Sequence, residues 1–269
     1  MLVAAALAVG ILVGVLSGLT GIGGGVLMVP FLYLLYARLA VPAADATVLA
    51  HATSLAVIVP TALRGLHAYR GQGLVRWREA MTLAAAAAVS AALCARVAVH
   101  VPGHALRTGF GVFLVVVAID LLRHRERAGA APLEGRASTV YAALLGLPIG
   151  ALSAFLGVGG GIVATIGMYY VLHIRFESVP PTSLAVIAVT AAAGSLSYLL
   201  TTPPAPLPFG GVVGLVDFSH ALPLAVGAVL AAPFGVRLNR RLPVAMVRRL
   251  FSVFILLIGL DIVWENVLR

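Results

Sequence analysis

Two glycine clusters are the residues in this chain best suited to bind a ligand. GIGGG occupies positions 21–25 and GVGGG occupies positions 157–161, each inside a long apolar stretch. A helix that starts at Gly23–Gly25 or Gly159–Gly161 presents free N–H groups and the positive end of its dipole, which suit an anion. Glycine places no side chain between such an amide and its ligand. We therefore predict an anion-binding site that contains Gly21, Gly23, Gly24 and Gly25 together with Gly157, Gly159, Gly160 and Gly161. Close packing of backbone is the alternative explanation for these glycines.

Hydroxyl side chains accompany both clusters. Ser17 and Ser153 come just before the glycines and could bond either freed backbone groups or substrate. Two matched pairs follow at a distance, Thr53-Ser54 and Thr182-Ser183, and these are either helix N-caps or donors to substrate. We include all six hydroxyls in the predicted substrate site.

One histidine comes two residues before the first Thr-Ser pair, and the second repeat has Pro180 in its place. His51 could carry a coupling proton or be an ordinary interfacial residue. Ser17-Gly18 with His51 also resembles a Ser-His hydrolase pair, but Ser153 has no matching histidine and no orienting acid is evident. We therefore expect no catalytic residues.

Other charged or reactive residues carry weaker signals. Arg96 and Arg237 end their predicted helices, where interaction with the helix dipole or snorkelling is the default and attraction of an anion the alternative. Asp120 and Asp261 lie near helix ends and are expected at interfaces rather than as proton carriers. The lone Cys94 excludes an intrachain disulfide and a cysteine-based metal site. The glycine clusters lack the Lys-Ser/Thr ending of a P-loop, and we expect neither a metal nor another cofactor.

Composition indicates what must position these residues. The 269-residue chain is 61% hydrophobic and 10% charged, with a mean hydropathy of +1.09, whereas soluble domains carry about 25% charged residues. Apolar runs repeatedly exceed the roughly 18 residues that mark a spanning helix. This predicts an all-α membrane protein with many spans, in contact with the lipid bilayer. We attribute the net charge of +9 to the positive-inside bias rather than to nucleic-acid binding.

The second half of the sequence repeats the first. Besides the glycine clusters, TSLAVI at 53–58 recurs at 182–187, and a third block that starts with GLV at 73–75 recurs from 214–216. We therefore divide the chain into a first repeat (1–122), a polar cytoplasmic linker (123–137) and a second repeat (138–269). The apolar segment 22–36 is too short to cross about 30 Å of hydrocarbon as a helix. Each repeat thus reads as a short helix pair broken at glycine, followed by three transmembrane helices.

The number of crossings predicts how the two repeats are oriented. The short pair either reaches halfway into the membrane or crosses it twice, and both cases leave an odd number of crossings per repeat. An odd repeat reinserts upside down, which gives the inverted-repeat plan of many transporters. If the 65–79 loop is cytoplasmic, only Arg38, Arg96, Arg107 and Arg269 of the eighteen arginines face outward. This bias favours both termini outside.

The paired GxGGG clusters, the Thr-Ser segments that follow and the basic linker resemble the sulfite exporter TauE/SafE family of bacterial membrane transporters. The resemblance covers nearly the whole chain, and GLTGIGGGVLMVPFL at 18–32 carries it most clearly. The second repeat departs from the pattern at Ile166, where the family usually keeps a proline. The resemblance implies a secondary carrier that exports small anions, such as sulfite, sulfonates or related organosulfur anions, across the bacterial inner membrane. A channel is the alternative, and we expect a monomer or homodimer.

Overall fold

The chain is described here by a computed structural model covering residues 2–123, 135–202, 209–239, 241 and 244–267. Most of the predicted linker, 124–134, falls outside this described part. The helices are α1 (Leu2–Thr20), α2 (Gly25–Arg38), α3 (Ala43–Ala68), α4 (Trp77–Ala98), α5 (Gly103–Arg123), α6 (Gly135–Leu156), α7 (Gly161–Tyr170), a 3₁₀ turn η1 (Phe176–Ser178), α8 (Val179–Leu199), α9 (Phe218–Asn239) and α10 (Val244–Val267). A two-stranded antiparallel hairpin precedes α9, with β1 (Val212–Val213) paired to β2 (Val216–Asp217).

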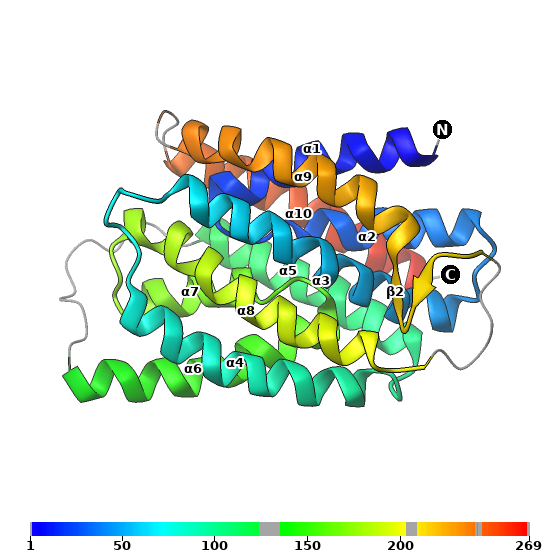
Figure 1. Ribbon diagram of the computed structural model, residues 1–269, viewed down its shortest axis with the longest axis horizontal. Helices are drawn as coiled ribbons and strands as arrows, with labels where there is room; N and C mark the ends of the chain where they lie inside the picture. The colour runs from blue at the N-terminus through cyan, green and yellow to red at the C-terminus, as the bar shows by residue number, and fades with distance from the viewer. Residues whose placement is uncertain (1, 124–134, 203–208, 240, 242–243, 268–269) are drawn as a thin grey trace.

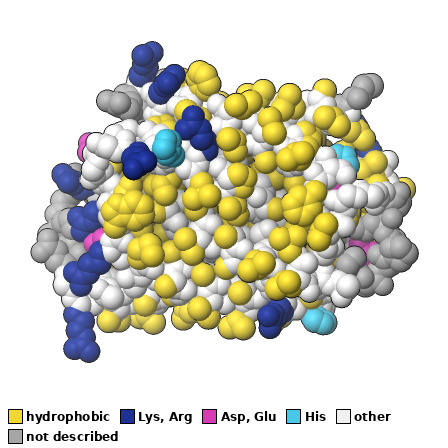
Figure 2. All heavy atoms as spheres, viewed as in Figure 1, with side chains coloured by type: hydrophobic (Ala, Val, Ile, Leu, Met, Phe, Trp, Pro, Cys, Tyr) yellow, Lys and Arg dark blue, Asp and Glu magenta, His cyan; other side chains and the backbone are white. Residues whose placement is uncertain are grey.

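The helices are long and apolar, as the composition predicts. Within the described residues, seven helices could cross a membrane by length and hydropathy: α1, α3, α4, α5, α6, α8 with its 3₁₀ turn, and α9. The helices that follow the glycine clusters, α2 and α7, are shorter. Hydrophobic side chains form a broad band across the middle of the surface (Figure 2). The prediction of an all-α polytopic membrane protein is confirmed.

Helices at matching positions of the two predicted repeats contact one another in opposite directions. On α3, Gly65 lies against Leu184 of α8, while Gly194 near the end of α8 lies against Leu55. The pair α5 and α10 also runs antiparallel, because Gly111 lies against Val263 while Gly259 lies against Leu114 and Val115. The remaining long helices pair as α1 with α9 and α4 with α6 (Figure 1). An inverted repeat would produce this arrangement, although the division into repeats and their orientation in a membrane stay predictions.

Small residues bring the paired helices into backbone contact. On α1, a side chain at Gly10, Gly14 or Gly18 would meet the backbone of α9. On α6, Gly146 and Gly150 lie equally close to the backbone of α4. Glycine is required at these positions because any Cβ would push the helices apart. In the sequence these glycines recur every four residues, a spacing that is typical of packed membrane helices and predicts this role. The structure confirms it.

The long axis of the molecule has two chemically different ends. We call one the arginine-rich end: α3, α5 and α9 finish there, α4, α6 and α10 begin there, and arginine side chains gather over it (Figures 1 and 2). We call the other the hairpin end, because the β1–β2 hairpin and both chain termini lie there (Figure 1). The predicted excess of arginines on one side thus appears as an excess at one end of the molecule.

Candidate anion site at the two glycine breaks

Each glycine cluster interrupts a helix pair where the sequence predicts it. Helix α1 ends at Thr20 and α2 begins at Gly25, while α6 ends at Leu156 and α7 begins at Gly161. The residues before the new helices, Gly24 and Gly160, have left-handed backbone with φ of 75° and 77°. An L side chain at such a φ costs about 1–2 kcal/mol, so glycine is favoured there for conformational reasons alone.

The two breaks meet each other. A Cβ on Gly25 would lie 2.6 Å from Cα of Val158, and one on Gly161 would overlap the carbonyl oxygen of Ile22. Two isoleucines at matching positions, Ile58 of α3 and Ile187 of α8, fill the space beside both breaks. A Cβ on Gly159 would lie 3.1 Å from Ile58 and 3.0 Å from Ile187. The structure therefore brings the two clusters together between α3 and α8.

Four carbonyl groups at the breaks accept hydrogen bonds from hydroxyl or amide side chains. The hydroxyl of Tyr69 donates to Gly18 O at 3.2 Å, and that of Tyr198 donates to Ala154 O at 2.9 Å. Ser54 donates to Gly157 O at 2.8 Å, and the Asn239 amide donates to Leu19 O. The first N–H groups of α2 and α7, in contrast, have no carbonyl one turn earlier to bond. The centre thus offers N–H groups at the start of both helices, while the carbonyl oxygens of Ile22 and Val158 also lie beside the opposite break.

Two buried hydroxyls beside the breaks lack partners. Ser17 and Ser153 are almost completely buried, and neither Oγ has a hydrogen-bond partner among the described residues. Ser17 and Ser153 lie four residues before Gly21 and Gly157. Their backbone carbonyls are bonded: Gly21 N donates to Ser17 O at 2.8 Å, and Gly157 N donates to Ser153 O at 2.9 Å. An unsatisfied buried hydroxyl costs about 1–3 kcal/mol, which a bound ligand would relieve. These serines are therefore the strongest side-chain candidates for substrate contact.

The Thr-Ser pairs occupy positions other than those expected of caps. Thr53 and Ser54 lie in the middle of α3, and Thr182 and Ser183 lie inside the first turns of α8, so the N-cap alternative is wrong. The hydroxyl of Thr53 accepts from Asp217 N at 3.0 Å, and that of Thr182 accepts from Arg76 N at 3.1 Å. These bonds fasten the segments before α9 and α4, a role that sequence reasoning missed. Ser183 donates to Gly161 O at 3.5 Å, so only the serine of each pair bonds a break.

His51 lies directly against the second break. A Cβ on Gly157 would lie 2.6 Å from Cα of His51. The His51 ring is completely buried, and its Nδ1 has no hydrogen-bond partner among the described residues. Nε2 lies 2.5 Å from the hydroxyl of Tyr33, whose ring stacks under the Arg107 guanidinium. His51 is therefore hydrogen-bonded to Tyr33 and not to Ser17. The Ser-His hydrogen bond that a hydrolase would need is not formed.

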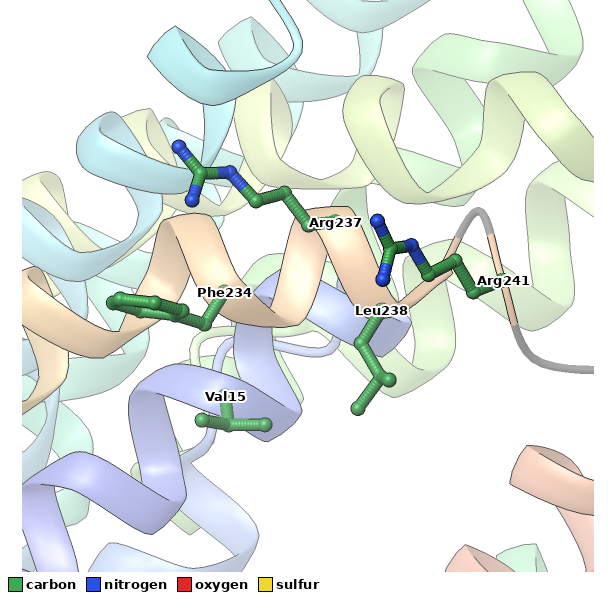
Figure 3. A pocket seen from close by; sticks show the side chains of 5 residues that line it. All are labelled: Val15, Phe234, Arg237, Leu238 and Arg241. Carbon is green, nitrogen blue, oxygen red and sulfur yellow. The ribbon is translucent and has the colours of Figure 1, made fainter.

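Two clefts open at the arginine-rich end. A cleft of about 280 Å³ lies between the ends of α3 and α9 and is lined by Arg64, Gln72 and Arg237, with Ala68, Pro233 and Val236. A larger one of about 810 Å³ lies between α1 and α9, with Arg237 and Arg241 above Val15, Phe234 and Leu238 (Figure 3). Arg237 lines both, as the anion-attraction alternative would require, whereas sequence reasoning missed Arg64. Among the described residues, no group of His, Cys, Asp or Glu could hold a metal ion.

Comparison with known proteins identifies the family to which this chain belongs. The family description sulfite exporter TauE/SafE matches residues 6–262. A probable membrane transporter protein of Methanocaldococcus jannaschii is 25% identical, over 94% of this chain and 92% of its own length. The probable membrane transporter protein YunE of Bacillus subtilis is 23% identical over 96% of both chains. No solved structure shows significant similarity. The chain therefore belongs to the sulfite exporter TauE/SafE family of membrane transporters.

Proposed function

We propose that the protein is a secondary transporter that moves small anions, such as sulfite, sulfonates or related organosulfur anions, out of the cell across the bacterial inner membrane. The observation that carries this proposal is the meeting of two glycine-capped helix N-termini at the centre of the molecule. Transport itself follows from the family, whereas the oxyanion and the outward direction are suggested by the family's description.

The chemistry of the centre favours a negative ligand. Two helix dipoles contribute partial positive charge, and each is equivalent to about half an elementary charge at its N-terminus. The Ser17 and Ser153 hydroxyls add one donor beside each break. Because these groups lie in an apolar surrounding, their attraction for an anion is less screened than in water. An oxyanion with several acceptor oxygens would satisfy N–H groups and hydroxyls together.

The route to this centre starts at the arginine-rich end in our proposal. Arg64 and Arg237 line a cleft there, so anions would concentrate at that mouth before they reach the breaks. With both termini outside, this end faces the cytoplasm, and loading there would lead to export. Ile58 and Ile187 fill the space beside the breaks, so passage requires helices to rearrange. That requirement favours an alternating-access carrier over the channel alternative.

Reconstitution in liposomes tests this function. Purified protein would be screened for flux of sulfite, sulfoacetate, sulfate and carboxylates, with and without a pH gradient. With a pH gradient, we expect at least one oxyanion to accumulate against its own concentration gradient. A protonophore should abolish this accumulation, because the pH gradient supplies the energy. Flux that only dissipates a gradient would instead identify a channel, and no flux of any oxyanion would contradict the proposal.

A further inference from the structure

A buried polar network at the hairpin end is not used by the anion site. The carboxylate of Asp217, in β2, is fully buried. Its Oδ2 lies 2.6 Å from Nδ1 of His220 and accepts from the Tyr36 hydroxyl at 3.2 Å. The Tyr36 hydroxyl also lies 3.2 Å from Oγ1 of Thr53, which receives the Asp217 N–H. Asp217 therefore joins α2, α3 and the start of α9 through its carboxylate and its backbone N–H.

The matching place at the arginine-rich end has different chemistry. In the repeated block, Arg76 stands opposite Asp217 and Glu79 opposite His220. Arg76 and Glu79 form an ion pair at 2.8 Å, and Arg76 N bonds Thr182 as Asp217 N bonds Thr53. The same backbone-to-threonine hydrogen bond is thus present at both ends of the molecule. At the arginine-rich end it forms without a histidine. An arginine side chain stays protonated at any physiological pH, whereas histidine exchanges its proton readily near neutrality.

Asp217 and His220 are paired within this network. Among the described residues, the other titratable group in contact with it is Tyr36 of α2. From α3 it meets the Thr53 hydroxyl, while His51 of the same helix contacts Tyr33 instead. From α8, the Tyr198 carbonyl accepts the N–H of Leu215 in the hairpin, and the apolar ring of Phe209 lies against His220. No other described cation is bonded to the buried carboxylate.

We propose that Asp217 and His220 form a proton-operated latch that holds the hairpin end closed. With a proton on Nε2, His220 is an imidazolium and the pair is neutral overall. Loss of that proton leaves a net negative charge on a fully buried carboxylate, which then has hydrogen bonds from Tyr36 and His220 but no opposite charge beside it. Such a state costs several kcal/mol unless water reaches it. Deprotonation therefore favours separation of α2, α3 and α9 at this end, and reprotonation closes it. This inference rests on the proposed carrier function, in which the proton would be the coupling ion.

Hydrogen–deuterium exchange tests the latch without any transported substrate. Amide exchange of residues 209–220 would be measured in the full-length protein at about pH 5.5 and pH 8, corrected for intrinsic exchange rates. We expect the corrected exchange to be at least about tenfold faster at pH 8, because the hairpin end opens there. Equal protection of wild type at the two pH values overturns the proposal, with no variant needed.

Variants test whether the Asp217–His220 pair, rather than another titratable group, causes the pH dependence of exchange. In Asp217→Asn/His220→Gln neither side chain titrates, so we expect slow exchange at both pH values. The matched control Glu79→Gln, at the equivalent site of the other end, and His51→Gln should keep the wild-type response. A double variant that retains the pH response overturns the latch. If exchange responds as expected but no oxyanion flux is found, the latch stands and the carrier function fails.

Discussion

Ser17 and Thr53 show that two buried hydroxyls in one protein have different tasks. The hydroxyl of Ser17 has no partner among the described residues, while that of Thr53 receives the Asp217 N–H and lies 3.2 Å from the Tyr36 hydroxyl. Removal of an unpaired hydroxyl relieves a cost, whereas removal of a paired one leaves a buried N–H unsatisfied. Stability and substrate affinity should therefore respond in opposite ways at the two positions.

We predict that Ser17→Ala keeps or slightly raises thermal stability while it raises KM for the transported anion about tenfold, since 1.4 kcal/mol of lost binding is a factor of ten. Thr53→Val should instead lower the free energy of unfolding by about 1–3 kcal/mol. Thermal unfolding in detergent and flux in liposomes measure the two effects. Unchanged KM in both Ser17→Ala and Ser153→Ala would remove the serines from the site.

At the residue scale, the sequence predicts which residues begin helices better than it predicts which side chains form hydrogen bonds with one another. The helix starts at Gly25 and Gly161 follow from the backbone needs of glycine, which are local, and they are confirmed. The partners of Thr53 could not be predicted, because Asp217 lies far along the chain and meets it only after α3 and α9 have packed. The aligned repeat did carry one usable signal: Tyr69 falls opposite Tyr198, and both hydroxyls bond carbonyls before a break.

At the scale of helices, the close contact between α1 and α9 depends on glycine residues. Positions Gly10, Gly14 and Gly18 form one face of α1, and the backbone of α9 lies against all three. The four-residue spacing predicts such a face from sequence, but it cannot identify α9 as the partner, because that pairing connects the two halves of the chain. Contact between helices of different repeats is set by tertiary packing rather than by local pattern.

We expect Gly14→Ala to destabilise the protein, because its Cβ would overlap the backbone of Ala228. Gly109→Ala is the matched control: it also lies inside a helix, but nothing stands within 4 Å of its Cβ. That control should be neutral or stabilising by up to about 1 kcal/mol, from helix propensity alone. Equal melting temperatures for the two variants would contradict the close approach of α1 and α9.

The whole molecule combines one chemical asymmetry with a nearly symmetrical framework. The helices α3 and α8 run antiparallel, as do α5 and α10, which is the arrangement that the predicted inverted repeat would produce. Arginines concentrate at one end, and both termini lie at the other (Figures 1 and 2). Sequence predicts this distribution because loop charge follows membrane topology. It does not predict the clefts at Arg64 and Arg237, which exist only where α3 and α9 finish side by side.

Orientation in the membrane follows as a prediction at this scale. In a Cys94→Ala background, a cysteine at Gly71 would mark the arginine-rich end and one at the exposed Val213 the hairpin end. We expect a membrane-impermeant thiol reagent, added outside intact cells, to label the Val213 position and spare the Gly71 position. The reverse pattern would place the arginines outside and overturn the proposed route of export.

The central claim is that the meeting point of the glycine breaks binds the transported anion. The most direct measurement compares oxyanion flux in liposomes for Gly159→Ala and Gly71→Ala. Both glycines have positive φ, 76° and 84°, so both variants carry similar backbone strain. A Cβ at Gly159 would lie 3.0–3.1 Å from the two central isoleucines, whereas at Gly71 it would meet nothing within 4 Å. Our account predicts flux reduced about tenfold or more in Gly159→Ala, as loss of about 1.4 kcal/mol would produce, and near-normal flux in Gly71→Ala. Equal flux in the two variants, with both inserted and stable, would contradict it.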